Sequence, residues 1–298
     1  MKPAALATGA VRRRLLILSA LVVVLIYHWQ ASSPPVARFN PMPPARAAAA
    51  DAFDDVAQEN SFESLLRTDP VGALVDAREA HLRNVRDYTC TFVKQESLPK
   101  GMSAEQVISV KFREAPFTVM MHWVRNEDMA KRVIYQAGRW IDSRARPDER
   151  EQAVCQPGVI AQLFLKSIKQ PTRGARARQT SRRFIDEFGF IKALDIFLES
   201  SKLAQSRNEL TMEFLGESQF DGRPTWVIRR FLPYTGPDCP YPDGTVLLHL
   251  DQEWRVFTAI YSYADRESKQ LLGRYEYRSV KMNPGLAQSE FEPATYGM

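Results

Sequence analysis

The stretch YTCTFVKQES, residues 88–97, decides how the central part of the chain folds. In a β-strand successive side chains point to opposite faces, so Tyr88, Cys90 and Phe92 share one face. That face is apolar and carries a thiol, whereas the other face carries two threonines, a valine and a glutamine. The stretch therefore predicts a strand whose apolar face lines an ordinary core, a reactive-cysteine site or a cavity for an apolar ligand.

The segments on the carboxyl side of this strand continue the alternation. Residues 105–114 alternate, residues 116–124 are apolar on both faces, and residues 131–141 resemble two short strands around Ala137-Gly138. Short strands separated by turn residues favour an antiparallel meander.

A second set of strands follows after residue 208. The dipeptide Asp221-Gly222 between two alternating segments is a strong hairpin signal. The predicted strands of this half are residues 209–220, 224–233, 244–251, 253–264 and 271–282.

Helical patterns precede and separate the two sets of strands. Asp69 is a candidate N-cap, Pro70 suits the first helical position, and the apolar stripe then runs to about Val85. Residues 142–206 form a long middle segment with predicted helices at about 158–168 and 182–204. Nine or ten strands with two or three helices predict an α+β fold with a mainly antiparallel sheet.

The composition is that of a globular protein. The chain has 298 residues, of which 45% are hydrophobic and 25% charged, with a net charge of +5. This mild excess of basic residues does not by itself indicate nucleic-acid binding. We divide the chain into an N-terminal membrane segment at 1–31, a linker rich in Pro and Ala that ends in an acidic part at 32–68, and a domain at 69–298 with a helical, basic insertion at about 142–206.

The N-terminal segment predicts the cellular compartment. Three arginines, residues 12–14, precede the apolar run 15–29, which ends in Tyr27-His28-Trp29. As a helix the run measures about 22 Å, short of a hydrocarbon core of about 30 Å, and uncharged residues after it close most of the gap. Because cleavage sites near Ala31 are poor and the aromatic end suits a membrane interface, we favour a retained single-pass anchor over a cleaved signal peptide. Both alternatives place the domain on the outer, periplasmic side of the cytoplasmic membrane, where nucleic acid is not an expected partner.

Sequence signatures of catalysis are missing. The chain has no Gly-x-Ser-x-Gly, Walker-type, dinucleotide-glycine, Cys-x-x-Cys or His-Glu-x-x-His motif, and its four histidines are scattered. We expect no catalytic residue, metal or cofactor, and a protein that is not an enzyme. We interpret Cys90 as an inert buried thiol. Cys155 and Cys239 both lie in turn-rich segments, and a disulfide between them is a hypothesis that the outer compartment allows.

A basic segment at residues 166–183 has seven basic residues and no acidic one. It is either a solvated surface or a contact for anionic headgroups at the membrane. The candidate contact residues are Arg173, Arg176, Arg178, Arg182 and Arg183.

Strands that are apolar on both faces are the remaining signal. A sheet with one solvent-exposed face does not need two apolar faces. Either helices cover one face and the other lines an apolar cavity, or the sheet is the filled core of a barrel or sandwich. Strand phase selects seven candidate cavity-lining residues: Phe92, Val110, Phe112, Met121, Trp123, Trp226 and Ile228.

The order of elements resembles a known family. A helix leads into DYTCTFVKQES, then VISVKFREAPFTVMMHWV and RVIYQAGRWI, and later FLGESQFDGRPTWVIRRFLP, TVLLHLDQEWRVFTAIYSYA and YEYRSVKMNPGLAQSEFEP. This pattern, over about residues 70–293, resembles domain of unknown function 1571 and, more broadly, the LolA/LolB/RseB-like lipoprotein-carrier superfamily. The resemblance implies a half-barrel sheet wrapped around helices, with a cavity for acyl chains. The chain departs from the carriers in its predicted membrane helix and in its longer, basic middle segment.

We therefore expect a membrane-tethered, non-enzymatic binding protein for an acyl chain, lipid or lipoprotein. One alternative is a structural or sensory module with a filled core that binds a protein partner. Another is an envelope enzyme whose site no local motif reveals.

Overall fold

The computed structural model describes residues 53–127, 129–158 and 164–298. The predicted membrane segment 1–31 and the first part of the predicted linker lie outside these residues. None of the described helices is long and apolar enough to cross a membrane.

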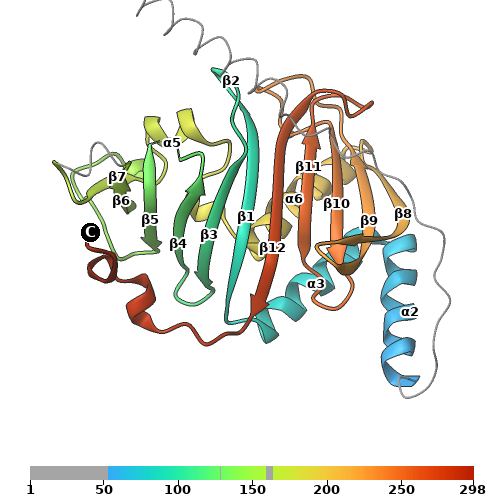
Figure 1. Ribbon diagram of the computed structural model, residues 1–298. Helices are drawn as coiled ribbons and strands as arrows, with labels where there is room; N and C mark the ends of the chain where they lie inside the picture. Colours follow the sequence, from blue (N-terminus) through green and yellow to red (C-terminus); the bar gives the residue numbers. More distant parts are fainter. Residues whose placement is uncertain (1–52, 128, 159–163) are drawn as a thin grey trace, which may run out of the picture. The chain divides into compact units, whose positions relative to one another are not determined.

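A twelve-stranded open antiparallel sheet forms the body of the fold (Figure 1). Its order is β7-β6-β5-β4-β3-β1-β12-β11-β10-β9-β8, with β2 paired to β1. The first long strand therefore pairs with the last one and joins the two meanders. The bounds are β1 Asp87–Leu98, β2 Gly101–Met102, β3 Gln106–Arg113, β4 Thr118–Arg125, β5 Ala130–Gln136, β6 Gln152–Pro157, β7 Ile168–Pro171, β8 Thr211–Phe220, β9 Arg223–Phe231, β10 Thr245–Asp251, β11 Phe257–Tyr263 and β12 Leu271–Met282.

Within the described residues, four α-helices accompany the sheet: α2 Phe53–Thr68, α3 Pro70–Asn84, α5 Ala175–Thr180 and α6 Phe190–Ser206. Short 3-10 turns are η1 Pro147–Glu149, η2 Ile185–Glu187, η3 Gln288–Phe291 and η4 Pro293–Tyr296. The predicted start of α3 is confirmed, because the Asp69 carboxylate accepts a hydrogen bond from the Gly72 amide at 2.9 Å and Pro70 occupies the first turn.

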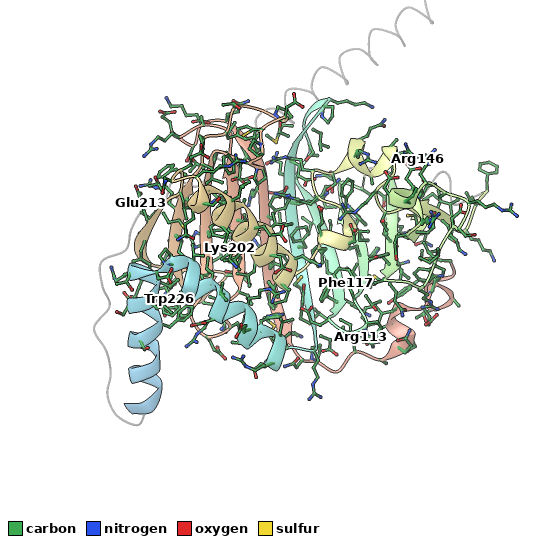
Figure 2. All side chains as sticks on the ribbon, turned by 180° about the vertical axis from the view of Figure 1, so that it is seen from behind. Arg113, Phe117, Arg146, Lys202, Glu213 and Trp226 are labelled. Atoms are coloured by element: carbon green, nitrogen blue, oxygen red, sulfur yellow. The ribbon has the colours of Figure 1, made fainter. Side chains whose placement is uncertain are left out.

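Helices α2, α3 and α6 lie on one face of the sheet, which we call the helix-covered face (Figure 2). Near α2 and α3 their buried apolar side chains pack on Trp226, Ile228 and Leu248 of β9 and β10. The other part of the core lies over β1 and β3–β6, where Phe188 and Phe190 enter from the segment around the start of α6. Tyr88, Cys90 and Phe92 all belong to this second part, as their shared strand phase predicts.

The C-terminal segment covers part of the opposite face. Phe291 of η3 is fully buried against Met120 of β4 and Ile134 of β5. In Figure 1 the red C-terminal segment passes from the end of β12 beneath β3 and β4 to β5.

The middle of the chain differs from the prediction. Residues 142–206 were expected to be a helical insertion, yet they contribute β6 and β7, which extend the sheet at one edge. Part of the predicted helix at 158–168 lies outside the described residues. The helix predicted at 182–204 begins at Phe190 and not near 182, because Gly189 adopts a φ of 109° and interrupts the pattern.

Two further boundaries also differ. Residues 53–68, which we had included in the linker, form α2, and its Phe62 and Leu66 are buried in the core. The second strand expected after Ala137-Gly138 is reduced to one bridge between Ile141 and Glu151.

Candidate functional site

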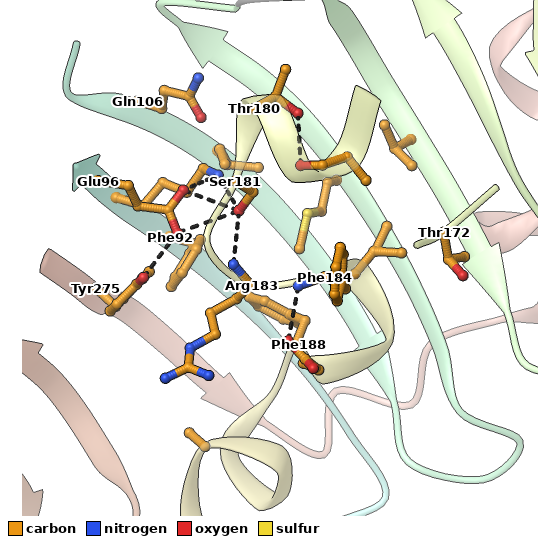
Figure 3. A pocket seen from close by; sticks show the side chains of 18 of the residues that line it. Phe92, Glu96, Gln106, Thr172, Thr180, Ser181, Arg183, Phe184, Phe188 and Tyr275 are labelled. Atoms are coloured by element: carbon orange, nitrogen blue, oxygen red, sulfur yellow. Dashed lines mark hydrogen bonds and ion pairs between the residues drawn. The ribbon is translucent and has the colours of Figure 1, made fainter. Parts of the chain in front are cut away.

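A cavity of about 540 Å³ lies between the helix-covered face and the segment from Leu165 to Phe197. Every strand from β7 to β9 in the sheet order contributes a lining residue, and α5, η2 and α6 provide the opposite wall. The lining is mainly apolar, with a few charged and hydroxyl groups (Figure 3). Its size lies within the range of about 300–1,000 Å³ that is typical of small-molecule sites.

The predicted lining residues fall into two groups. Phe92, Met121 and Trp123 border the cavity. Val110, Phe112, Trp226 and Ile228 lie on the same face of the sheet, but they are buried beneath other side chains and do not border it.

Aromatic packing explains why this second group is covered. The ring of Phe112 stacks on Tyr88 at 4.8 Å between centroids, and Phe188 lies within 5.9 Å of Phe112. Phe62 of α2 lies 5.3 Å from Trp226. Aromatic side chains from α2 and from the segment before α6 therefore cover Trp226 and Phe112, and the cavity lies between these two places.

Glu96 is the centre of a polar cluster in the cavity wall. This side chain is 1% exposed, and it accepts hydrogen bonds from Lys94 Nζ at 2.9 Å, Ser181 Oγ at 3.0 Å and Tyr275 Oη at 2.8 Å. The backbone amide of Arg182 donates to it at 3.2 Å. The cluster joins β1 and β12 to the segment between α5 and η2 (Figure 3).

The charge of Glu96 is stabilised by these contacts. Burial alone would raise the pKa of Glu96, but the Lys94 charge and the hydrogen bonds hold its pKa below the ordinary value. Burial and the neighbouring Glu96 charge raise the pKa of Tyr275 well above its usual range, so this phenol remains a donor.

Arg230 of β9 forms a second buried polar cluster at the cavity. It is 1% exposed and donates to Asp243 Oδ1 at 2.9 Å and to the hydroxyls of Ser200 and Ser201. Its Nε has no hydrogen-bond partner among the described residues. Burial lowers the pKa of Arg230, although Asp243 acts in the opposite direction.

The five basic candidates occupy different environments. Arg173 pairs with Asp186 at 2.8 Å, Arg178 pairs with Asp148 at 3.5 Å, and Arg182 donates to the Pro242 carbonyl at 2.9 Å. Arg176 and Arg183 border the cavity.

The three cysteines are free thiols. The Cys155 thiol lies near the Ala153 carbonyl at 3.9 Å and the Cys239 thiol near the Pro233 carbonyl at 3.6 Å, so each contacts its own segment. The bridge hypothesised between them is not formed. Burial raises the pKa of Cys90 far above its ordinary value, which fits an inert thiol.

Metal-binding geometry is not seen in the described part of the chain. Within residues 53–127, 129–158 and 164–298 no three His, Cys, Asp or Glu side chains are grouped to hold an ion. His81 pairs with Glu114 at 2.9 Å, and His249 contacts the Thr225 hydroxyl at 3.2 Å.

Sequence reasoning missed the polar part of the cavity. Lys94 and Glu96 continue the strand phase of Phe92, so two charges on an otherwise apolar face were a usable signal. Ser181, Arg230 and Tyr275 gave no comparable signal, because their approach to the cavity depends on pairing between distant segments.

The fold and cavity together define an α+β protein with an apolar ligand-sized site under the helices of an open antiparallel sheet. The family described as "Protein of unknown function (DUF1571)" matches residues 85–296, and the chain belongs to this family. The family expected from the sequence is thereby confirmed.

The curated proteins contain no sequence match to this chain. Solved structures do show similarity. MucB alone and the Pseudomonas aeruginosa MucA/MucB complex match at 16% and 15% identity, cover 75% of this chain in each case, and give TM-scores of 0.44 and 0.42. This chain spans 62% and 60% of those two chains.

Two further solved structures match this chain over nearly their own whole length. A putative outer membrane lipoprotein-sorting protein domain from Vibrio parahaemolyticus matches at 12% identity over 76% of this chain and 98% of its own, with a TM-score of 0.35. Lipoprotein LppX from Mycobacterium tuberculosis matches at 10% identity over 74% and 98%, with a TM-score of 0.38. Likenesses this distant say nothing about the ligand of the present chain.

Proposed function

We propose that the protein is a non-enzymatic binding protein for an acyl chain, lipid or lipoprotein, tethered at the outer side of the cytoplasmic membrane. The observation that carries this proposal is the mainly apolar cavity of about 540 Å³. A filled core, which the structural or sensory alternative requires, would leave no such space. Each CH₂ group moved from water into the cavity contributes about 0.8 kcal/mol, so desolvation is the driving force for binding.

The surroundings of the cavity support loading from a membrane surface. Met129 and Leu165 border the cavity and are about half exposed, at 50% and 45%. Phe164, the chain neighbour of Leu165, is exposed, and Arg176, which also borders the cavity, adds a positive charge. Apolar side chains next to basic ones are typical of segments that contact lipid headgroups.

Two matched variants on α5 test the proposal. Ala177 borders the cavity, whereas Ala175 is exposed on the same short helix. We expect the purified full chain to yield bound lipid on organic extraction and mass spectrometry, Ala177→Phe to yield much less, and Ala175→Phe to match the unmodified chain. Equal yields from all three, or no lipid from any of them, would contradict the proposal.

A further inference from the structure

The charged side chains that border the cavity include more basic residues than acidic ones. Lys94, Arg176, Arg183 and Arg230 are its basic residues, and Glu96, Glu187 and Asp243 are its acidic ones. Each carboxylate already has a basic partner: Lys94 for Glu96, Arg230 for Asp243, and Arg173, which lies outside the lining, for Glu187. The basic residues that have no carboxylate partner among the described residues are Arg176 and Arg183.

Arg183 is the more confined of the two. Arg176 is exposed, whereas Arg183 is partly buried, and its guanidinium has no hydrogen-bond or ion-pair partner in the described part of the chain. Its backbone amide donates to Ser181 Oγ at 3.4 Å, which anchors the residue beside the Glu96 cluster. Figure 3 shows the Arg183 side chain directed away from that cluster.

A second unsatisfied donor belongs to the same cavity. Arg230 borders the cavity and is almost fully buried, and its Nε lacks a partner among the described residues. The Arg183 charge is close enough to act on both neighbours: it adds to the lowering of the Arg230 pKa that burial causes, and it opposes the rise in the Tyr275 pKa that burial and Glu96 cause. Arg183 and Arg230, each with donors that no described residue uses, therefore both border the cavity.

Arg183 is partly buried and has no carboxylate partner among the described residues, so an anion in the cavity would pair with a charge that burial has already removed in part from water. A guanidinium presents donors in a planar fork that fits carboxylate and phosphate oxygens. Both features call for a ligand that brings its own negative charge.

We propose that the cavity takes an amphiphile whose anionic head, a carboxylate or a phosphate, pairs with Arg183 while its chain lies along the apolar lining. This inference rests on the proposed function and adds the class of ligand. It excludes an uncharged acyl chain as the preferred occupant.

The test compares charged and uncharged ligands of equal chain length. The full chain in phosphatidylcholine nanodiscs is loaded with the uncharged fluorophore N-phenyl-1-naphthylamine, with Ala177→Phe as the background. Hexadecanoate, hexadecyl phosphate and 1-hexadecanol then compete for the probe. A charge-assisted hydrogen bond predicts that at least one anion displaces the probe about tenfold to a hundredfold better than the alcohol, and the better of the two shows whether the head is a carboxylate or a phosphate.

Variants assign the preference to Arg183. Arg183→Gln is expected to lose the preference for the anion and keep its affinity for 1-hexadecanol, which also shows that the variant is folded. Arg183→Lys should retain part of the preference, and Lys192→Gln, which removes an exposed charge outside the lining, should retain all of it. Equal displacement by anion and alcohol in the unmodified chain, or an unchanged preference in Arg183→Gln, overturns this inference and leaves the proposed function standing. No specific probe binding at all overturns both.

Discussion

At the scale of single residues, the Glu96 cluster shows how a charge is kept inside an apolar cavity. A buried carboxylate is tolerated when its lone pairs are used, and here an ammonium, a hydroxyl, a phenol and a backbone amide use them. The same contacts hold the segment before α6 against β1 and β12. Glu96 is therefore both a part of the cavity wall and a link between distant parts of the chain.

Removing one partner of the Lys94–Glu96 pair should lower the free energy of unfolding more than removing both partners. We expect Glu96→Leu to lower the free energy of unfolding by about 3–5 kcal/mol, because Lys94 then stays in a largely buried position without its partner. The double variant Lys94→Met/Glu96→Leu should recover much of that loss. Urea unfolding of the three chains measures this, and a double variant less stable than Glu96→Leu would contradict it.

His249 should make stability depend on pH in a defined window. Burial lowers its pKa from 6.5 to about 4, against the opposing charge of Glu276, so the folded state binds fewer protons than the unfolded state between these values. Stability from this residue is fully present above pH 6.5 and falls as the pH drops toward 4, by up to about 3 kcal/mol. Urea unfolding at pH 7, 5.5 and 4 should show a shallower decline for His249→Gln than for the unmodified chain, and parallel declines would argue against this assignment.

The sequence predicted residue positions well where one strand's phase is enough. Tyr88, Cys90 and Phe92 share a buried face as expected. Whether that face is covered or open was not predictable, because Phe188 and Phe190 reach it from a segment about a hundred residues away. The cavity borders the part of this face that no described side chain from the helices or from the segment before α6 covers.

At the scale of elements, the sequence predicted those that local signals define and missed those that depend on pairing between distant segments. The Asp221-Gly222 turn joins β8 and β9 with positive φ values of 51° and 76°, as a two-residue hairpin requires. Strands β6 and β7 were missed, because they are short and partly polar, and their place in the sheet depends on pairing with β5.

Helix α5 is the element through which we expect contact with an anionic membrane surface. Its Arg176 and Arg178 are exposed, and it forms part of the cavity wall. Each basic residue near an anionic surface contributes about 1 kcal/mol, so Arg176→Glu/Arg178→Glu should weaken binding to phosphatidylserine vesicles at least tenfold.

A control of equal charge change separates this site from general electrostatics. Lys192 and Lys202 are exposed on α6. Vesicle co-sedimentation of Lys192→Glu/Lys202→Glu should show a smaller loss than the α5 variant. Equal losses would assign the effect to net charge and remove α5 as a contact element.

At the scale of the whole described domain, other segments of the chain pack on both faces of the sheet. The helices and the cavity occupy one face, and the C-terminal segment after β12 packs on the other. Polar contacts hold this segment: Lys111 pairs with Glu290 at 2.8 Å, and Arg113 donates to the Leu286 carbonyl at 2.7 Å. The segment thus covers β3–β5, whose other face contributes part of the cavity lining.

Phe291 should be the main apolar contribution of this C-terminal cover. Its ring is fully buried against Met120 and Ile134, with the Arg113 guanidinium 4.7 Å from its centroid. Truncating a buried phenylalanine costs about 3–5 kcal/mol, so Phe291→Ala should lower the urea midpoint strongly. Phe164 is 88% exposed, and Phe164→Ala should leave the midpoint almost unchanged. Because β4 borders the cavity with Met121 and packs on Phe291 with Met120, the Phe291 variant should also bind the naphthylamine probe less tightly. A Phe291→Ala chain as stable as Phe164→Ala would show that the C-terminal segment is not part of the cooperative fold.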